Sequence, residues 1–125
     1  MAAARASRIL VVDDEPSIRA LLVRVLKAEG YEAVALNDGL AGLDAALTAA
    51  DPYDLVITNN RMPHLSGAEL VAQLRAAHPG LPILHLDDLS RPEAAELPPD
   101  VPNLRKPFNL GALLDHVGRL LQGVR

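Results

Sequence analysis

The stretch at residues 54–63 constrains the fold most, because an apolar run in it passes directly into a polar loop. Residues 55–58 are apolar or β-branched without polar alternation, which is typical of a strand buried on both faces. Such strands belong to parallel sheets, which bind ligands at the carboxyl ends of their strands. Asn59, the first polar side chain after this run, is therefore expected to lie at a functional site.

Apolar runs and helical stripes alternate along the rest of the chain. Four further strands are predicted at residues 8–12, 31–36, 82–86 and 101–105. Helices are predicted from Pro16 to Gly30, over 40–50, from Ser66 to about His78, and after Asn109. Ser66 and Glu69 form a capping-box pattern at the start of the third of these. Five strands alternating with helices predict a parallel α/β sheet with right-handed crossovers.

The connection before the last predicted strand is rich in proline. Residues 88–102 contain Pro92, Pro98, Pro99 and Pro102. Because an interior proline costs a helix about 3 kcal/mol, any helix here is limited to residues 93–97. Pro102 is tolerated if the fifth strand lies at the sheet edge. The proline-rich stretch would change the surface around this connection. The alternative is that it reflects only the ordinary variation of a surface loop.

Composition excludes several classes of function. The 125 residues, half of them hydrophobic, fit a single domain, expected at residues 7–122. A net charge of −4 with one Phe, two Tyr and no Trp offers neither the basic surface nor the stacking platform of a nucleic-acid-binding protein. The absence of cysteine excludes disulfides and thiolate metal sites. No apolar run is long enough for a membrane span, and residues 1–6 are too short for a signal peptide, so a cytoplasmic protein is expected.

No pattern typical of an enzyme is present. The histidines have no metal-ligand spacing and are expected to be packed or surface residues; they are His64, His78, His85 and His116. Nothing matches a hydrolase triad or a nucleotide-binding loop. The sequence therefore favours a protein that is not an enzyme.

Three short motifs occur in order along the chain. The first is residues 8–16, where an apolar run is followed by three acidic residues and Pro16. The second is Met62 and Pro63 followed by Gly67, and the third is the triplet Lys106, Pro107 and Phe108. Together they resemble the receiver domain of bacterial two-component response regulators, over residues 7–122. The resemblance implies a flavodoxin-like, CheY-like doubly wound sheet of five parallel strands in the order 2-1-3-4-5, here with a short or irregular fourth helix. It also implies a role in phosphorelay signal transduction, with a histidine kinase or an output protein as partner.

The resemblance assigns roles to residues near the strand ends. Asp14, the residue at position 59 and the backbone carbonyl of Arg61 would hold Mg²⁺, with Asp13 supporting it through water. Lys106 would contact the transferred phosphoryl group. The alternative for Asp13 and Asp14 is an acidic helix N-terminus favoured by the helix dipole, worth about 0.3–1 kcal/mol.

Three positions depart from the receiver pattern. Asn59 stands where the family has its phosphate-accepting aspartate, Asp87 where it has Thr or Ser, and Asn103 where it has a switch aromatic. An amide is not an anionic nucleophile, so Asn59 cannot form an acyl phosphate. As a neutral ligand it would also weaken a Mg²⁺ site, so the cofactor is possible but weakened.

The carboxylate of Asp87 offers a substitute for the one lost at position 59. We expect Asp87 to pair with Lys106, an attraction of about 4 kcal/mol at a separation of about 4 Å before desolvation. The alternative is that Asp87 is simply solvated at the end of a strand.

The sequence thus predicts a pseudo-receiver that cannot be phosphorylated and that binds protein partners. The expected surface is formed by the fourth and fifth strands and the last helix, which could also form a homodimer. Nucleic acid and membranes are not expected to be direct partners. The alternative is a working, Mg²⁺-dependent phosphoacceptor in which the aspartate was replaced by Asn59 through engineering. A third possibility is partial deamidation of Asn59 to aspartate.

Overall fold

Parallel strands form the central layer of the structure, a computed structural model that describes residues 6–62, 64–86 and 97–122. The strands are β1 (Arg8–Val12), β2 (Glu32–Leu36), β3 (Leu55–Asn59), β4 (Ile83–Leu86) and β5 (Asn103–Leu104). The helices are α1 (Pro16–Ala28), α2 (Gly39–Thr48), α3 (Gly67–Ala77) and α4 (Leu110–Gln122). The strand order is β2-β1-β3-β4-β5, which confirms the predicted flavodoxin-like sheet.

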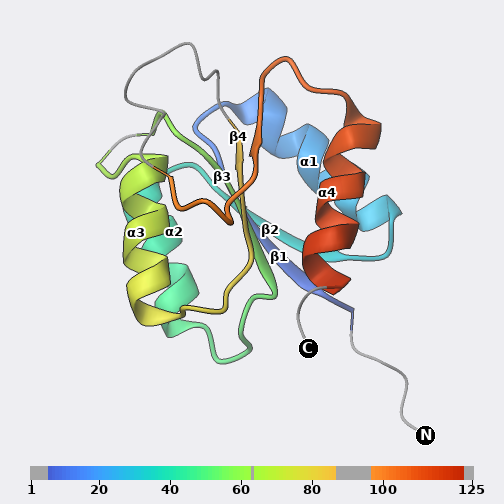
Figure 1. The fold of residues 1–125 in the computed structure, drawn as a ribbon. Coiled ribbons are helices and arrows are strands. Elements are labelled where there is room, and N and C mark those ends of the chain that lie inside the picture. The colour runs from blue at the N-terminus through green and yellow to red at the C-terminus, as the bar shows by residue number, and fades with distance from the viewer. Residues whose placement is uncertain (1–5, 63, 87–96, 123–125) are drawn as a thin grey trace, which may run out of the picture.

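Helices cover both faces of the sheet, with α1 and α4 on one side and α2 and α3 on the other (Figure 1). On the α1 and α4 face, strand residues such as Ile57 pack against Leu22 and Leu113, all fully buried. On the other face, Val56 packs in a cluster with Leu70 and Leu74 of α3. The central strand β3 is buried on both sides, as its unbroken apolar sequence predicts. None of the helices in the described ranges is long and apolar enough to cross a membrane.

Local sequence signals set the helix ends. The predicted capping box is present, since Glu69 N donates to the Ser66 hydroxyl at 3.1 Å and Ser66 N donates to the Glu69 carboxylate at 3.0 Å. Gly30, with φ +91°, follows α1 in a conformation that glycine adopts without steric cost. Asn109 accepts a hydrogen bond from Ala112 N at 3.2 Å at the start of α4. These contacts satisfy backbone groups that helix ends leave unpaired.

The fifth strand is shorter than the five residues predicted at 101–105. Only Asn103 and Leu104 pair with β4, opposite His85 and Leu86. Pro102 has no N–H to donate, although its carbonyl accepts a hydrogen bond from His85 N at 3.0 Å. β5 is nevertheless an edge strand, as Pro102 requires. Of the helix considered at 93–97, residues 93–96 lie outside the described residues, and Leu97 packs against the apolar cluster on the α3 side.

The strand register places the ends of β1 and β3 side by side. Val12 lies opposite Thr58, so Asp13, the first residue after β1, lies next to Asn59, the last residue of β3. Gly67, at the start of α3, packs against the backbone of Asn59 and Asn60. The fold therefore brings three distant parts of the chain to one edge of the sheet.

Replacing Gly67 with alanine is expected to destabilise the protein. A Cβ atom there would lie 2.3 Å from the carbonyl oxygen of Asn59 and 2.7 Å from the Cα of Asn60, both backbone atoms that cannot move aside. Overpacking of this kind costs about 1–3 kcal/mol. Urea unfolding measures the change, with Gly118→Ala in α4 as the control. A Cβ at Gly118 meets nothing within 4 Å, so this control is expected to gain up to about 1 kcal/mol. An unchanged midpoint for Gly67→Ala would contradict the close packing.

Candidate functional site

Three carboxylates gather at the carboxyl end of β1. One oxygen from each of Asp13, Asp14 and Glu15 lies within 4.8 Å of the others, with Asp13 buried and the other two exposed. Carboxylate oxygens are the ligands that hard cations such as Mg²⁺ prefer. This cluster could therefore hold a divalent metal, and Asp13 and Asp14 are two of the residues for which the sequence predicted that role.

Lys106 contributes a positive charge to this cluster. Its Nζ lies 3.2 Å from Asp13 Oδ2 and 3.2 Å from Glu15 Oε1. Lys106 lies two residues after β5, and this position places its side chain near the end of β1. The contribution of Glu15 was missed by sequence reasoning, although its place directly after Asp13 and Asp14 was a signal.

The Asp13 carboxylate is held by the chain around it. One of its oxygens accepts a hydrogen bond from Glu15 N at 2.9 Å, and its backbone carbonyl accepts one from Arg19 at 2.9 Å. Burial raises the pKa of Asp13, and the hydrogen bond from Glu15 N and the charge of Lys106 oppose that rise. The buried carboxylate is thus compensated by a fixed donor and a fixed cation.

The side-chain amide nitrogen of Asn59 faces this cluster. Nδ2 lies 3.3 Å from Asp14 Oδ1 and 3.1 Å from the backbone carbonyl of Arg61, and the residue is only 4% exposed. Both neighbours are acceptors, so the nitrogen and not the oxygen must face them. These two neighbours are the same groups that the receiver resemblance assigns to the metal. The carboxylates and the carbonyl fit a hard cation, whereas the N–H groups of Asn59 do not.

The loop after β3 is anchored by its own polar contacts. Asn60, also buried, accepts a hydrogen bond from Ala68 N at 3.0 Å through its side chain and one from Gly67 N at 2.8 Å through its carbonyl. The Thr58 hydroxyl donates to the carbonyl of Asn59 at 2.9 Å. These bonds fix the backbone of β3 against the start of α3, and so fix the direction of the Asn59 side chain.

A hydrogen-bonded contact between two side chains joins this loop to α2. Asp38 caps α2, accepting hydrogen bonds from Leu40 N and Ala41 N, and its other oxygen lies 2.5 Å from His64 Nδ1. The hydrogen bond with His64, followed by those from the helix backbone, lowers the pKa of Asp38. His64 has φ +70°, a left-handed conformation uncommon for residues other than glycine. Nothing in the sequence pattern predicted this contact.

Other predicted site residues fall in different places. Asp87 and Pro63 lie outside the described residues, so the predicted pairing of Asp87 with Lys106 stays a prediction. Asn103 lies in β5, opposite His85 of β4, and its Oδ1 is 2.7 Å from Nδ1 of the buried His85. That contact was also missed, because the sequence predicted His85 only as a packed or surface residue.

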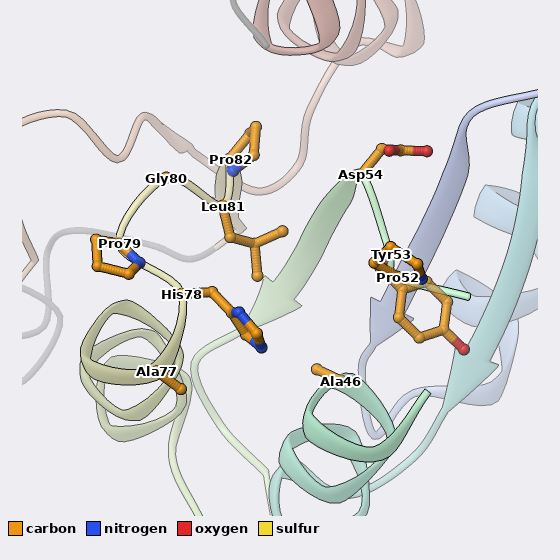
Figure 2. A pocket seen from close by; sticks show the side chains of 10 residues that line it. All are labelled: Ala46, Pro52, Tyr53, Asp54, Ala77, His78, Pro79, Gly80, Leu81 and Pro82. Carbon is orange, nitrogen blue, oxygen red and sulfur yellow. The ribbon is translucent and has the colours of Figure 1, made fainter. Parts of the chain in front are cut away.

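A cavity of about 410 Å³ lies at the amino ends of the strands, where β3 and β4 begin. Figure 2 shows Tyr53, from the connection after α2, and His78, from the end of α3, among the side chains that line it. Asp54 of this region accepts a hydrogen bond from Arg8 N at 2.8 Å. This cavity is separate from the acidic cluster, since the two lie at opposite ends of the strands.

Comparison with known proteins gives consistent matches. Residues 9–117 match the family described as the response regulator receiver domain. The response regulator MprA of Mycolicibacterium vanbaalenii is 40% identical over 118 residues, which make up 92% of this chain and 50% of that protein. MprA of Mycobacterium tuberculosis is 38% identical over 118 residues, again 92% of this chain and 50% of the relative. The chain thus spans about half the length of these curated relatives.

Solved structures show the same similarity. The signal receiver domain of a signal transduction histidine kinase from Syntrophus aciditrophicus has a TM-score of 0.87 at 30% identity, covering 96% of this chain and 93% of that one. The chemotaxis response regulator CheY4 of Vibrio cholerae has a TM-score of 0.81 at 31% identity, covering 93% of this chain and 99% of the other.

The Asp38 contacts make stability dependent on acidity. Because the pKa of Asp38 is lower in the folded chain than its usual 3.8, the stabilisation is present above 3.8 and is lost as the pH falls through the folded pKa. Asp38→Asn keeps an oxygen for the helix N–H groups but carries no charge. The stability of Asp38→Asn is therefore expected to fall less than that of the parent between about pH 5 and pH 2. Urea unfolding across this range tests it, with Asp44→Asn as a control for removing a carboxylate from α2. Equal acid sensitivity of the parent and Asp38→Asn would contradict the assignment.

Proposed function

Because this chain belongs to the response regulator receiver domain family, we propose that it is a pseudo-receiver, which binds protein partners in two-component signalling without accepting a phosphoryl group. The module comprises residues 7–122 and is not an enzyme. The observation that carries this proposal is the orientation of Asn59, whose amide nitrogen faces Asp14 and the carbonyl of Arg61.

Phosphoryl transfer to a receiver requires a nucleophile at the end of β3. A carboxylate there attacks phosphorus with an anionic oxygen. The amide of Asn59 is neutral, and its nitrogen already donates to two acceptors. Neither its chemistry nor its orientation supports the formation of an acyl phosphate.

The same orientation supports a weakened metal site. Receiver domains bind Mg²⁺ at an acidic pocket, and Asp13, Asp14 and Glu15 supply the carboxylates for one here. For Mg²⁺ to use Asp14 and the Arg61 carbonyl, the hydrogen bonds from Asn59 must break and its oxygen must turn inward. Asn59 would then offer a neutral ligand where the family offers an anion, so the gain on binding is smaller. When bound, Mg²⁺ would neutralise charge around an incoming phosphoryl group.

The negative charge of the acidic cluster is already partly compensated by donors of this chain. Lys106 contacts Asp13 and Glu15, and Asn59 contacts Asp14. Each described carboxylate of the cluster thus has a donor from the protein itself. This supports a module that keeps one arrangement of its signalling surface instead of alternating between two.

A protein partner is supported by an apolar hollow beside Lys106. A cavity of about 460 Å³ between α1 and the start of α4 is lined by Ile18, Leu21 and Phe108 together with Glu15 and Lys106. Concave apolar surfaces with a few charged groups at their border are typical of binding sites. The proposed partners are a histidine kinase or an output protein. A homodimer through β4, β5 and α4 is a further possibility that the oligomeric state in solution would test.

One observation favours the alternative of a working phosphoacceptor whose aspartate was changed to Asn59. The acidic cluster and its contact with Lys106 are intact, as an active pocket would require. An aspartate restored at position 59, by mutation or by deamidation, could therefore accept a phosphoryl group. The experiment below separates the two possibilities.

The proposal predicts no phosphorylation of the parent chain. Intact mass is measured after incubation with Mg²⁺ and acetyl phosphate, a small phosphodonor. The parent is expected to gain no phosphoryl group. Asn59→Asp is expected to gain one only if the rest of the pocket is competent, and Asn60→Asp controls for a carboxylate placed one residue away.

A phosphoryl adduct on the parent would overturn the proposal and direct the search to Asp13, Asp14 or Asp87 as acceptor. An adduct on Asn59→Asp alone would favour an engineered or recently lost acceptor. If no protein gains mass, a feature other than Asn59 also prevents phosphorylation, and Asp87 becomes the first candidate for it.

A further inference from the structure

A buried histidine pairs with an asparagine at the edge of the sheet. His85, in β4, is fully buried, and its Nδ1 lies 2.7 Å from Oδ1 of Asn103 in β5. A buried imidazole that lost its hydrogen bonds would carry a desolvation penalty, so this contact favours the arrangement that provides it. The receiver resemblance assigns no role to His85, although Asn103 stands at the position of the switch aromatic.

The backbone alone holds β5 only weakly. β5 pairs with β4 over two residues, His85 with Asn103 and Leu86 with Leu104. The His85 amide also donates to the carbonyl of Pro102 at 3.0 Å. So short an edge strand makes few ladder hydrogen bonds, and its register needs another determinant.

The side-chain pair can supply that determinant. If β5 slipped by one residue, Pro102 or Leu104 would lie opposite His85 in place of Asn103. Neither side chain can accept a hydrogen bond from the imidazole. A slip would also turn Leu104 away from the apolar cluster that it packs against on the α1 and α4 face. Of these registers, only the observed one keeps both the contact between His85 Nδ1 and Asn103 and the packing of Leu104.

The register of β5 determines where Lys106 lies. Lys106 is two residues beyond the end of β5, and its Nζ reaches both Asp13 and Glu15 at 3.2 Å. A shift by one residue moves the backbone by about 3.3 Å and reverses the side-chain direction. Such a shift would remove Lys106 from the acidic cluster.

We propose that His85 and Asn103 are positioning residues, which fix the register of β5 on β4 and thereby place Lys106 at the acidic cluster. This role does not depend on whether Asn59 accepts a phosphoryl group, so it goes beyond the proposed function. It applies equally to the parent and to an Asn59→Asp variant.

The first test compares Asn103→Leu with Asn103→Asp. Leucine has similar size but no acceptor, whereas aspartate keeps an oxygen that can accept from His85 Nδ1. The readout is competitive acetylation of Lys106 relative to Lys27, the only other lysine of the chain, which is exposed in α1. Asn103→Leu is expected to raise the relative labelling of Lys106, and Asn103→Asp is expected to leave it near the parent value. Equal labelling of Lys106 in all three proteins would overturn the proposal.

Amide hydrogen exchange shows whether the change is local. In Asn103→Leu, exchange of the His85 amide is expected to be about tenfold faster, the effect of losing roughly one hydrogen bond. The Val11 amide in β1 is expected to keep its rate, which would exclude general destabilisation as the cause. An unchanged rate at His85, or an equal acceleration at Val11, would contradict a local role.

A measurement on the parent needs no variant. If Asn103 Oδ1 accepts from His85, the imidazole must carry its proton on Nδ1, and its ring ¹⁵N shifts are expected to show that single tautomer. His78, exposed at the end of α3, is the control for an averaged ring. Averaged shifts for His85, or a ring with Nδ1 deprotonated, would overturn the pairing. These readouts involve no phosphodonor, so their failure is distinguishable from failure of the proposed function.

Discussion

The convergence of carboxylates at the end of β1 is the constraint on which the rest of the site depends. Asp13, Asp14 and Glu15 leave the sheet beside β3 because parallel strands end at the same edge. Carboxylates brought this close repel one another, and Asp13 is buried as well. The chain offsets that repulsion with two groups of its own, the ammonium of Lys106 and the amide of Asn59. These two donors thus offset part of the negative charge that a bound metal cation would otherwise neutralise.

The ammonium of Lys106 and the amide of Asn59 can offset the charge of the carboxylates only if both are held in position. Asn59 is held because the loop after β3 is tied to the start of α3 by Asn60, by Gly67 and by the capping box. Lys106 is carried by a strand of two residues, whose register we attribute to His85 and Asn103. The two supports lie on different strands, yet both serve the same cluster. We propose that a module built this way presents one surface to its partners.

Much of the fold could be predicted from sequence, because its signals are local or periodic. The apolar run of β3 revealed a buried parallel strand, and Ser66 with Glu69 revealed a helix start. The predicted length of β5 was wrong, since Pro102 cannot donate to the sheet. The missed contacts join residues far apart in the chain: Lys106 to Glu15 across 91 positions, His64 to Asp38 across 26, and His85 to Asn103 across 18. No periodic pattern encodes such pairs, because they depend on side-chain directions set by the assembled sheet.

The most direct test of this account is a Mg²⁺ titration followed through the side-chain amide signals of Asn59. If the amide bridges Asp14 and the Arg61 carbonyl as observed, these signals are expected to stay unchanged at Mg²⁺ concentrations that saturate an Asn59→Asp variant, followed there through the backbone amide of Arg61. Saturable shifts of the Asn59 amide at those same concentrations would show that Mg²⁺ readily displaces the bridge. That result would contradict the proposal that Asn59 weakens the metal site.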